Sequence, residues 1–221
     1  MAQVFRPSAN TIAKLSIVLL VFLGAGGLCA LDIIHRSPYV RHTKVAIQQP
    51  VMYSHRHHVS MGIDCRYCHT SVEDSSFANI PPTRICMNCH NEIWTDSAML
   101  EPVRESWRTG EPLEWVRVHD LPDFVYFDHS IHVNRGVACV TCHGQVDEMP
   151  LTWREKPLFM KWCLDCHREP EKFIRPRDEV TNMAFEWPAG VDPLEEGRKL
   201  AEEYGIDQSN HRLTDCWVCH R

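Results

Sequence analysis

The chain has 221 residues, a hydrophobic content of 44% and a formal net charge of −6. Its Lys and Arg residues are scattered and form no basic stripe, which argues against nucleic-acid binding. Cysteine is the unusual residue, because ten of the 11 cysteines occur in pairs with one common spacing. The function therefore has to be sought around these pairs.

The amino-terminal segment predicts a membrane anchor. Residues 1–10 form a short tail that we expect in the cytoplasm, and residues 11–31 are apolar except for Lys14 and Ser16. This length is about enough to cross a hydrocarbon core if Lys14 extends to the interface. A cleaved signal peptide is the alternative, with residues 25–27 (AGG) as the small residues before a cut. We favour the retained anchor, followed by a connector over residues 32–50.

The remaining residues, 51–221, contain the motif Cys-x-x-Cys-His five times. This is the spacing of c-type haem attachment. The two thiols bond to the haem vinyl groups, the histidine supplies one axial nitrogen to the iron, and one helical turn brings the three groups together. We therefore predict five haem c groups. The predicted attachment residues are Cys65, Cys68, Cys86, Cys89, Cys139, Cys142, Cys163, Cys166, Cys216 and Cys219. The predicted proximal iron ligands are His69, His90, His143, His167 and His220.

Two other uses of cysteine pairs fit the sequence less well. A disulfide framework would not place a histidine after every second thiol. A zinc ribbon uses two Cys-x-x-Cys pairs per metal but gives no reason for five histidines at the same offset. We also expect haem to replace much of the protein core. The predicted fold is therefore mostly α, with short helices, extensive irregular loops and little sheet after one transmembrane helix.

Two stretches of the chain repeat. Residues 53–58 (YSHRHH) and 127–132 (FDHSIH) share the pattern aromatic-x-His-x-x-His, and each is followed after the same gap by a haem motif. A second motif then follows the first in both stretches, at a similar but not identical spacing. This indicates the duplication of a two-haem module over residues 51–100 and 125–175. The fifth motif stands alone within residues 176–221.

Each His-x-x-His pair predicts two distal iron ligands. Low-spin haem iron needs a sixth ligand, and neutral imidazole binds it well. Histidines three residues apart on a helix are neighbours, yet each can face a different haem. We expect His55 and His129 to bind the haem attached just downstream, and His58 and His132 to bind a haem of another motif. His57 is an alternative to His58, because the second repeat has isoleucine at that place.

The sequence offers several candidates for the distal ligand of the fifth haem. His119 is the leading candidate, because it precedes the second pair in a segment similar to ligand-bearing stretches of related multihaem proteins. A methionine would raise the potential of that haem. The competing candidates are Met149, Met160, Met183, His57 and His211.

The repeated unit resembles class III multihaem cytochromes c, and longer stretches resemble one family more closely. The apolar span and residues 53–59 (YSHRHHV), 64–69 (DCRYCH), 119–127 (HDLPDFVYF) and 160–168 (MKWCLDCHR) are similar to the pentahaem membrane-anchored subunit of alternative complex III. The resemblance runs from about residue 5 to the carboxyl end and is least diagnostic over residues 176–210. It implies a quinol-oxidising respiratory complex with an iron–sulfur subunit, quinone-binding membrane subunits and a downstream cytochrome or oxidase as acceptor.

These inferences predict an electron-transfer subunit without a catalytic site of its own. Basic residues flank the apolar span on both sides, so the positive-inside rule does not decide its orientation. Haem attachment outside the cytoplasm places residues 51–221 on the periplasmic side. The alternatives are a membrane-anchored multihaem quinol dehydrogenase and, less favoured, a multihaem reductase subunit. A reductase would need one five-coordinate haem. The additional histidines in the sequence argue against this, because they can supply sixth ligands.

Overall fold

The computed structural model describes residues 5–6, 8–207 and 212–220, and the chain divides into two parts, residues 1–43 and 44–221. The division falls within the segment expected to be a connector. We call residues 1–43 the anchor part and residues 44–221 the haem-motif part.

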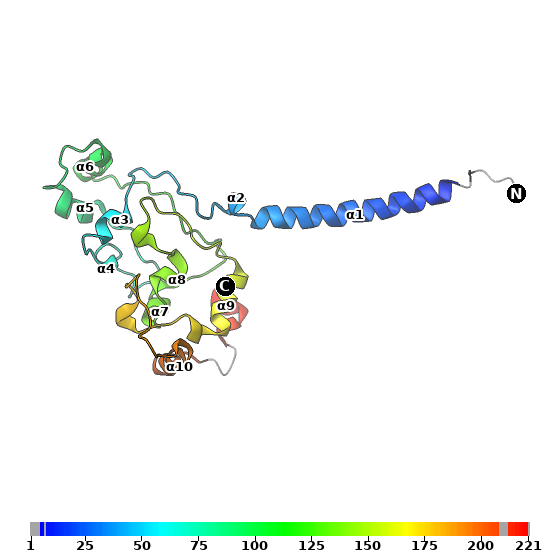
Figure 1. The fold of residues 1–221 in the computed structure, drawn as a ribbon. Coiled ribbons are helices and arrows are strands. Elements are labelled where there is room, and N and C mark those ends of the chain that lie inside the picture. The colour runs from blue at the N-terminus through cyan, green and yellow to red at the C-terminus, as the bar shows by residue number, and fades with distance from the viewer. Residues whose placement is uncertain (1–4, 7, 208–211, 221) are drawn as a thin grey trace. The chain divides into compact units, whose positions relative to one another are not determined.

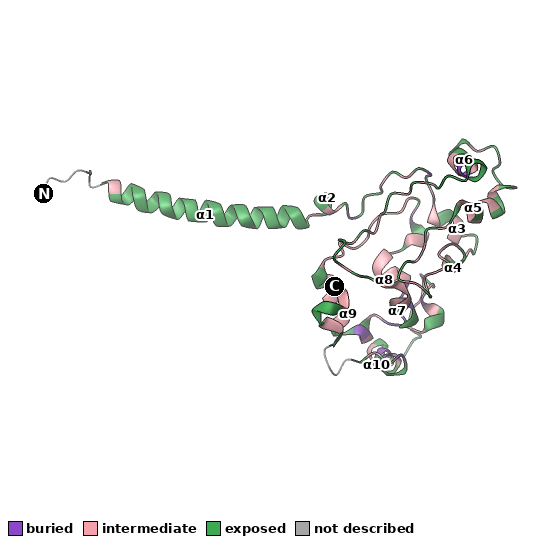
Figure 2. Ribbon diagram, turned by 180° about the vertical axis from the view of Figure 1, so that it is seen from behind, coloured by how far each residue is buried: buried purple, intermediate pink, exposed green. Residues whose placement is uncertain are grey.

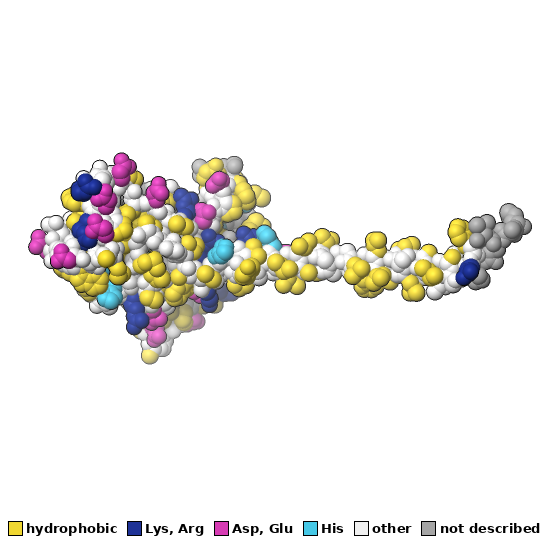
Figure 3. Space-filling view, turned by 90° about the horizontal axis from the view of Figure 1, so that it is seen from above, with side chains coloured by type: hydrophobic (Ala, Val, Ile, Leu, Met, Phe, Trp, Pro, Cys, Tyr) yellow, Lys and Arg dark blue, Asp and Glu magenta, His cyan; other side chains and the backbone are white. Residues whose placement is uncertain are grey.

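The anchor part consists of α1 (Ser8–Arg36) and the short α2 (Pro38–Arg41). The helix α1 has 29 residues, none of them buried, and is long and apolar enough to cross a membrane. Hydrophobic and neutral side chains cover most of its length (Figure 3). It extends beyond the predicted residues 11–31 at both ends and stops before Pro38, which begins α2 behind the capping side chain of Ser37.

The haem-motif part is built from short helices joined by long irregular segments (Figure 1). Its α-helices are α3 (His55–Val59), α4 (Cys65–Cys68), α5 (Thr83–His90), α6 (Glu101–Thr109), α7 (His129–Asn134), α8 (Cys139–His143), α9 (Met160–Arg168), α10 (Pro193–Glu203) and α11 (Cys216–Cys219). Its 3-10 helices are η1 (Ala98–Leu100), η2 (Val146–Glu148), η3 (Pro170–Lys172), η4 (Arg177–Glu179) and η5 (Arg212–Thr214). Among the described residues, β-structure is limited to two isolated bridges, Ala46–Trp153 and Val137–Ile174. The predicted fold class is confirmed.

The protein side chains alone form only a small core. The most deeply buried large side chains are Met149 and Val180, and most of the ribbon in Figure 2 has the colours of exposed and half-buried residues. In the carboxyl-terminal region α10 packs on η3 so closely that a Cβ at Gly197 would lie 1.9 Å from the carbonyl oxygen of Glu171. This contact fixes the segment that follows the fourth motif.

Candidate functional site

All five Cys-x-x-Cys pairs lie in helical turns. Helices α4, α8 and α11 begin at the first cysteine of their motif, whereas α5 and α9 begin earlier and contain the motif in their second half. The turn closes with bonds such as His69 N–H to the Cys65 carbonyl and His220 N–H to the Cys216 carbonyl, both 2.9 Å. Each motif thus presents two thiols and an imidazole from one turn, as haem attachment requires.

The two His-x-x-His sequences form the short helices α3 and α7. The side chain of Ser54 caps α3 by accepting a bond from His57 N–H, and Asp128 caps α7 by accepting one from Ile131 N–H. The cap residue holds the second histidine as well. Its carbonyl accepts a bond from the Nδ1 atom of His58 in α3 (2.8 Å) and of His132 in α7 (2.6 Å). The duplicated sequence therefore has duplicated local structure.

Each of these four histidines faces the histidine of a different haem motif. The separations between ring centroids are 6.5 Å for His55–His69, 6.1 Å for His58–His90, 6.4 Å for His129–His143 and 6.0 Å for His132–His167. The first histidine of each pair thus faces the motif just downstream, and the second faces the following motif. The alternative His57 has its ring contact with Trp94, at 6.0 Å.

These separations fit a haem between the two rings. With metal–nitrogen bonds of about 2.0 Å and a ring centre roughly 1.2 Å behind each nitrogen, two imidazoles on opposite sides of one iron are about 6.4 Å apart. Each pair also joins a distal candidate to a ring that directly follows two attachment cysteines. The residues present therefore fit four haem groups with two axial histidines each.

The second ring nitrogen of most of these histidines is already hydrogen-bonded. Besides the two cap contacts, the Nδ1 atoms of His69, His90, His167 and His220 contact the carbonyl oxygens of Asn79, Ile93, Leu213 and Phe124, at 2.7, 3.1, 2.6 and 3.1 Å respectively. A proton on Nδ1 that is donated to a carbonyl leaves the lone pair of Nε2 free for a metal. These contacts fix both the tautomer and the direction of each ring.

The two remaining contacts of this kind connect the two repeats. His55, of the first repeat, contacts the hydroxyl of Thr152 at 2.9 Å, and His129, of the second, contacts the carbonyl of Ser76 at 2.9 Å. Thr152 lies between the third and fourth motifs, and Ser76 lies between the first and second. Each repeat therefore orients one candidate distal histidine of the other.

Burial keeps several of these imidazoles neutral. Desolvation lowers the pKa of His55 to about 4 and that of His143 to about 3, with further lowering by neighbouring histidines. Burial also lowers the pKa of His132. A neutral imidazole is the form that binds iron, so these rings do not have to lose a proton first.

The motifs themselves lie next to one another. The attachment cysteines Cys65 and Cys139 lie close enough for each thiol to shift the pKa of the other, which joins the first and third motifs. In a haem-bound chain both sulfurs are thioethers and no longer titrate. The contact still shows that the attachment points of two motifs from different repeats lie together.

The fifth motif has different surroundings. The ring of His220 stacks on that of Phe124, with centroids 5.8 Å apart. The leading distal candidate, His119, instead has its ring 4.2 Å from that of His143, which is too close for the two to lie on opposite sides of one iron. Its Nε2 atom is buried without a hydrogen-bond partner, and burial lowers its pKa to about 4.

The methionine candidates divide by burial. Met149 and Met183 are buried, whereas Met160 is 65% exposed at the start of α9. His211 lies outside the described residues. The described contacts bring none of the candidates to His220, so they leave the distal ligand of the fifth site open.

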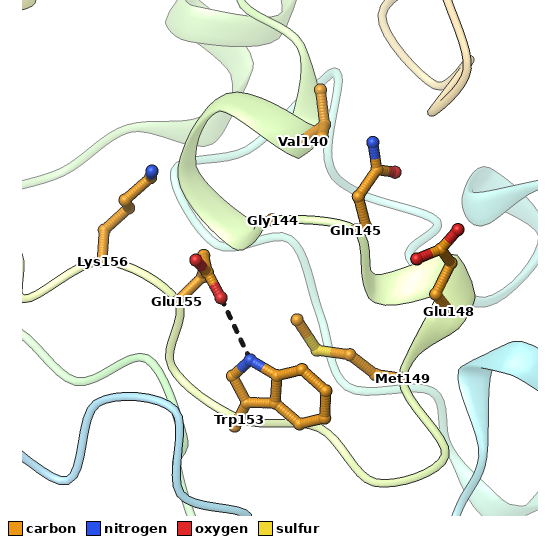
Figure 4. A pocket seen from close by; sticks show the side chains of 8 residues that line it. All are labelled: Val140, Gly144, Gln145, Glu148, Met149, Trp153, Glu155 and Lys156. Carbon is orange, nitrogen blue, oxygen red and sulfur yellow. Dashed lines mark hydrogen bonds between the residues drawn. The ribbon is translucent and has the colours of Figure 1, made fainter.

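A pocket of about 380 Å³ lies beside the third motif (Figure 4). Its apolar wall includes Met149 and the indole of Trp153, whose Nε1–H donates to Glu155 at 3.1 Å. Val140, which stands between the two cysteines of the motif, completes this wall. We therefore assign the pocket to the surroundings of the third motif.

The structure also bears on the two other uses of cysteine. The 11 cysteines, all of them in the described part of the chain, form no disulfide bond with one another. Within this part, no group of three or more His, Cys, Asp or Glu side chains is arranged to hold a metal ion directly.

Comparison with known proteins decides the kind of domain. Residues 125–221, which include the third, fourth and fifth motifs, match the family described as cytochrome c7 and related cytochrome c. The chain contains a cytochrome c7-like domain. Its cofactor is covalently bound haem c, held at more than one motif.

One characterised relative is similar over part of its length. It is the multihaem cytochrome c subunit of menaquinone reductase from Nitratidesulfovibrio vulgaris (strain Hildenborough), 36% identical over 98 residues. The similar stretch covers 43% of this chain and 46% of the relative. The chain thus spans less than half the length of the relative that it matches.

Sequence reasoning overlooked one group of residues at the site. Tyr53 and Phe127, the aromatic residues of the repeat, each contact both histidines of the helix that follows them. Their place two residues before the first histidine was the available signal. Thr152, which contacts His55, gave no such signal, because it is 97 residues away in the sequence.

Proposed function

We propose that this chain is the electron-transfer subunit of a membrane-bound, quinone-linked respiratory complex and carries five haem c groups. The four pairs of histidine rings at 6.0–6.5 Å carry the proposal. Bound haem iron supplies a one-electron carrier that changes between the ferrous and ferric states. A histidine on each side of the iron leaves no position for a small substrate, which suits electron transfer better than catalysis.

The proposal gives each predicted residue a role. The ten motif cysteines attach the haems, the five motif histidines are proximal ligands, and the distal ligands at four sites are His55, His58, His129 and His132. His119 remains a proposed distal ligand of the fifth site only if its ring leaves His143. Met160 is the alternative that lies on the same helix as the fourth motif.

The contacts support an order of the attachment sites: second, first, third, fourth, fifth. Tyr53 touches the distal histidines of the first and second sites, and Phe127 touches those of the third and fourth. The Cys65–Cys139 contact joins the first site to the third. The carbonyl of Leu213, just before the fifth motif, holds His167 of the fourth. We propose that electrons pass along this row.

We further propose that the complex is an alternative complex III. The resemblance of the apolar span, the first repeat and the stretches before the third and around the fourth motif supports this assignment. It implies an iron–sulfur subunit and quinone-binding membrane subunits as partners, and a cytochrome or oxidase as acceptor. The helix α1 would anchor the chain, with the haems on the periplasmic side, where haem is attached.

A second function is favoured by the relative, which belongs to a menaquinone reductase. In that case the chain would pass electrons toward a quinone instead of receiving them from a quinol. The haem sites would be the same in both cases. The direction of electron flow in the intact complex distinguishes them.

The test uses membranes that contain the complex with the full-length haem-loaded chain. We expect five haems per chain, reduction of these haems by added quinol, no quinol oxidation by the isolated chain, and no spectral change with carbon monoxide. Carbon monoxide binding at one haem of the undamaged protein would contradict the non-catalytic role. Oxidation of the haems by menaquinone, without reduction by quinol, would support the second function.

The order of the sites has its own test, with the haem count of each variant as a check on assembly. Replacing Cys139 and Cys142 by alanine removes the middle site, so reduction from one end should split into a fast and a much slower phase. Replacing Cys86 and Cys89 removes an end site and should leave a single fast phase with one haem fewer. The opposite result would overturn the order.

A further inference from the structure

The aromatic residue of each repeat lies against two histidine rings in two different ways. Tyr53 stacks on His58 with centroids 4.5 Å apart and planes inclined by 25°, but it meets His55 edge-on at 4.8 Å and 88°. In the second repeat Phe127 stacks on His132 at 4.5 Å and 24° and meets His129 at 4.7 Å and 88°. The two repeats thus agree closely in four contacts.

These contacts fix the planes of the distal rings. The second histidine of each helix is held on its face by the aromatic ring and at Nδ1 by the carbonyl of the cap residue, Ser54 or Asp128. The first histidine of each helix lies edge-on to the aromatic ring, and its Nδ1 atom is hydrogen-bonded to a residue of the other repeat. Because one ring stacks on the aromatic residue and the other stands nearly perpendicular to it, the two distal rings of a helix are strongly rotated against each other.

The rotation reaches the ring pairs that would hold iron. The planes are nearly parallel where the first histidine of a helix is involved, at 11° for His55–His69 and 19° for His129–His143. They are more inclined where the second is involved, at 70° for His58–His90, which is close to perpendicular, and at 42° for His132–His167, which is about midway. Each repeat contains one pair of each kind.

The angle between two axial imidazole planes changes the electronic state of the iron that they hold. Each imidazole interacts mainly with the iron d orbital perpendicular to its own plane. Two d orbitals of the iron can interact with the imidazoles in this way. Parallel rings act on the same one and separate the two orbitals strongly in energy, whereas perpendicular rings act on one orbital each and leave the two nearly equal in energy. Ferric iron then gives a rhombic low-spin signal in the first case and a highly anisotropic one in the second. Orientation of axial ligands is one of the means by which a protein tunes haem.

We propose that Tyr53 and Phe127 are positioning residues that orient the distal histidines, so that each repeat holds one haem with near-parallel and one with more inclined axial rings. This inference rests on the proposed axial pairs. With the proposed order of sites, the two near-parallel sites are neighbours in the middle of the row and the inclined sites flank them. Nothing in the sequence pattern alone distinguishes the two kinds of site.

A purely space-filling role for the two aromatic residues makes a different prediction. Leucine fills part of the same space but has no ring plane to stack on imidazole. If the aromatic residues only fill space, a leucine variant would lower stability and leave the spectral classes as they are. If they orient the rings, the class of one haem should change.

The test is electron paramagnetic resonance of the frozen, fully oxidised, haem-loaded chain. We expect two rhombic low-spin signals, a highly anisotropic signal from the second site and a signal of intermediate anisotropy from the fourth, in addition to the signal of the fifth haem. Tyr53→Leu should change the highly anisotropic signal and Phe127→Leu the intermediate one. The matched exchanges Tyr53→Phe and Phe127→Tyr keep the stacked ring and should leave all four signals in place.

The outcomes separate this inference from the proposed function. Near-infrared magnetic circular dichroism identifies bis-histidine ligation independently of the ring angles. Four bis-histidine haems of a single spectral class would overturn the inference and leave the proposed function intact. Fewer than four bis-histidine haems would overturn the proposed axial pairs. Leucine variants that keep the signals of both inclined sites would reduce the aromatic residues to space filling. If a leucine variant binds fewer haems, the number of spectral classes in the unaltered chain still tests the inference.

Discussion

The two repeats, residues 51–100 and 125–175, have the same ligand geometry in different surroundings. In both, a capped short helix carries two histidines that contact one aromatic ring, with centroids 4.8 and 4.5 Å apart in the first repeat and 4.7 and 4.5 Å apart in the second. The packing around them differs. Val133, Ala138 and Met149 of the second repeat are buried, whereas Val51 is the buried hydrophobic residue of the first.

The difference arises from the segment after the fourth motif. Its residues bond to the second repeat, through Arg175 N–H to the Gly136 carbonyl at 2.9 Å and Cys139 N–H to the Val180 carbonyl at 3.1 Å. In the first repeat, Gly62 takes the place of Gly136 and has open space around it, and this segment contacts the repeat through a hydrogen bond from the Thr181 hydroxyl to Asp64 at 3.4 Å. The geometry of the histidines and their aromatic ring is thus the same in both repeats, and the stability of that geometry depends on which segments cover it.

The largest effect is expected from removing a first distal histidine. His129→Ala should leave one haem per chain five-coordinate and high-spin, because no second imidazole faces His143 from the opposite side. His55→Ala should do the same at the first site. Optical and paramagnetic resonance spectra of the oxidised chain measure the change. An unchanged low-spin spectrum in either variant would reject that ligand assignment.

The next effect compares two equivalent glycines, each three residues before the first cysteine of a motif. Gly62 and Gly136 both have positive φ, +83° and +79°, so alanine should cost about 1–2 kcal/mol of backbone strain at either place. Only at Gly136 would the Cβ also collide, with the Arg175 carbonyl at 2.4 Å. Overpacking adds about 1–3 kcal/mol.

Thermal unfolding of the two haem-loaded variants, followed by circular dichroism, tests this difference. Gly136→Ala should lower the midpoint clearly more than Gly62→Ala. Equal midpoints would show that the covering segment, residues 170–205, does not stabilise the second repeat. The haem count of each variant should be unchanged, since neither glycine contacts a thiol.

The sequence predicted those features that local chemistry decides. The apolar span, the helical turns of the motifs and the helical placement of the His-x-x-His pairs follow from residue type and spacing, which act over one or two turns. Contacts between distant segments could not be predicted from the sequence. The positions of Thr152 against His55 and of His119 against His143 depend on how the two repeats pack, and no periodic pattern encodes that packing.

A smaller effect should come from the hydrogen bond between Thr152 and His55. Thr152→Val keeps the shape of the side chain but removes the hydroxyl that accepts the Nδ1 proton of His55. Without this hydrogen bond the imidazole of His55 donates less electron density to the iron. The potential of one haem should therefore rise, by an amount corresponding to about 0.5–1.5 kcal/mol. Potentiometric titration measures it. The second repeat serves as an internal control, because the acceptor there is the backbone carbonyl of Ser76, and its haems should keep their potentials.

The smallest effect is expected from replacing Arg66. This residue lies between the two cysteines of the first motif, at the position that Val140 occupies in the third. Arg66 is paired with Asp64 at 2.9 Å and with Glu73 at 3.3 Å, and the side chains are 43% exposed for the arginine and 44% for both acids. Exposed ion pairs contribute about 0–1 kcal/mol. Arg66→Val, which makes the first motif like the third, should therefore change the unfolding midpoint little and leave haem attachment unaffected. Because its guanidinium is already committed to two carboxylates, the potential of the first haem should also stay the same. A large shift in that potential would show that Arg66 leaves these partners to pair with a haem propionate, and the two repeats would then differ in chemistry as well as in packing.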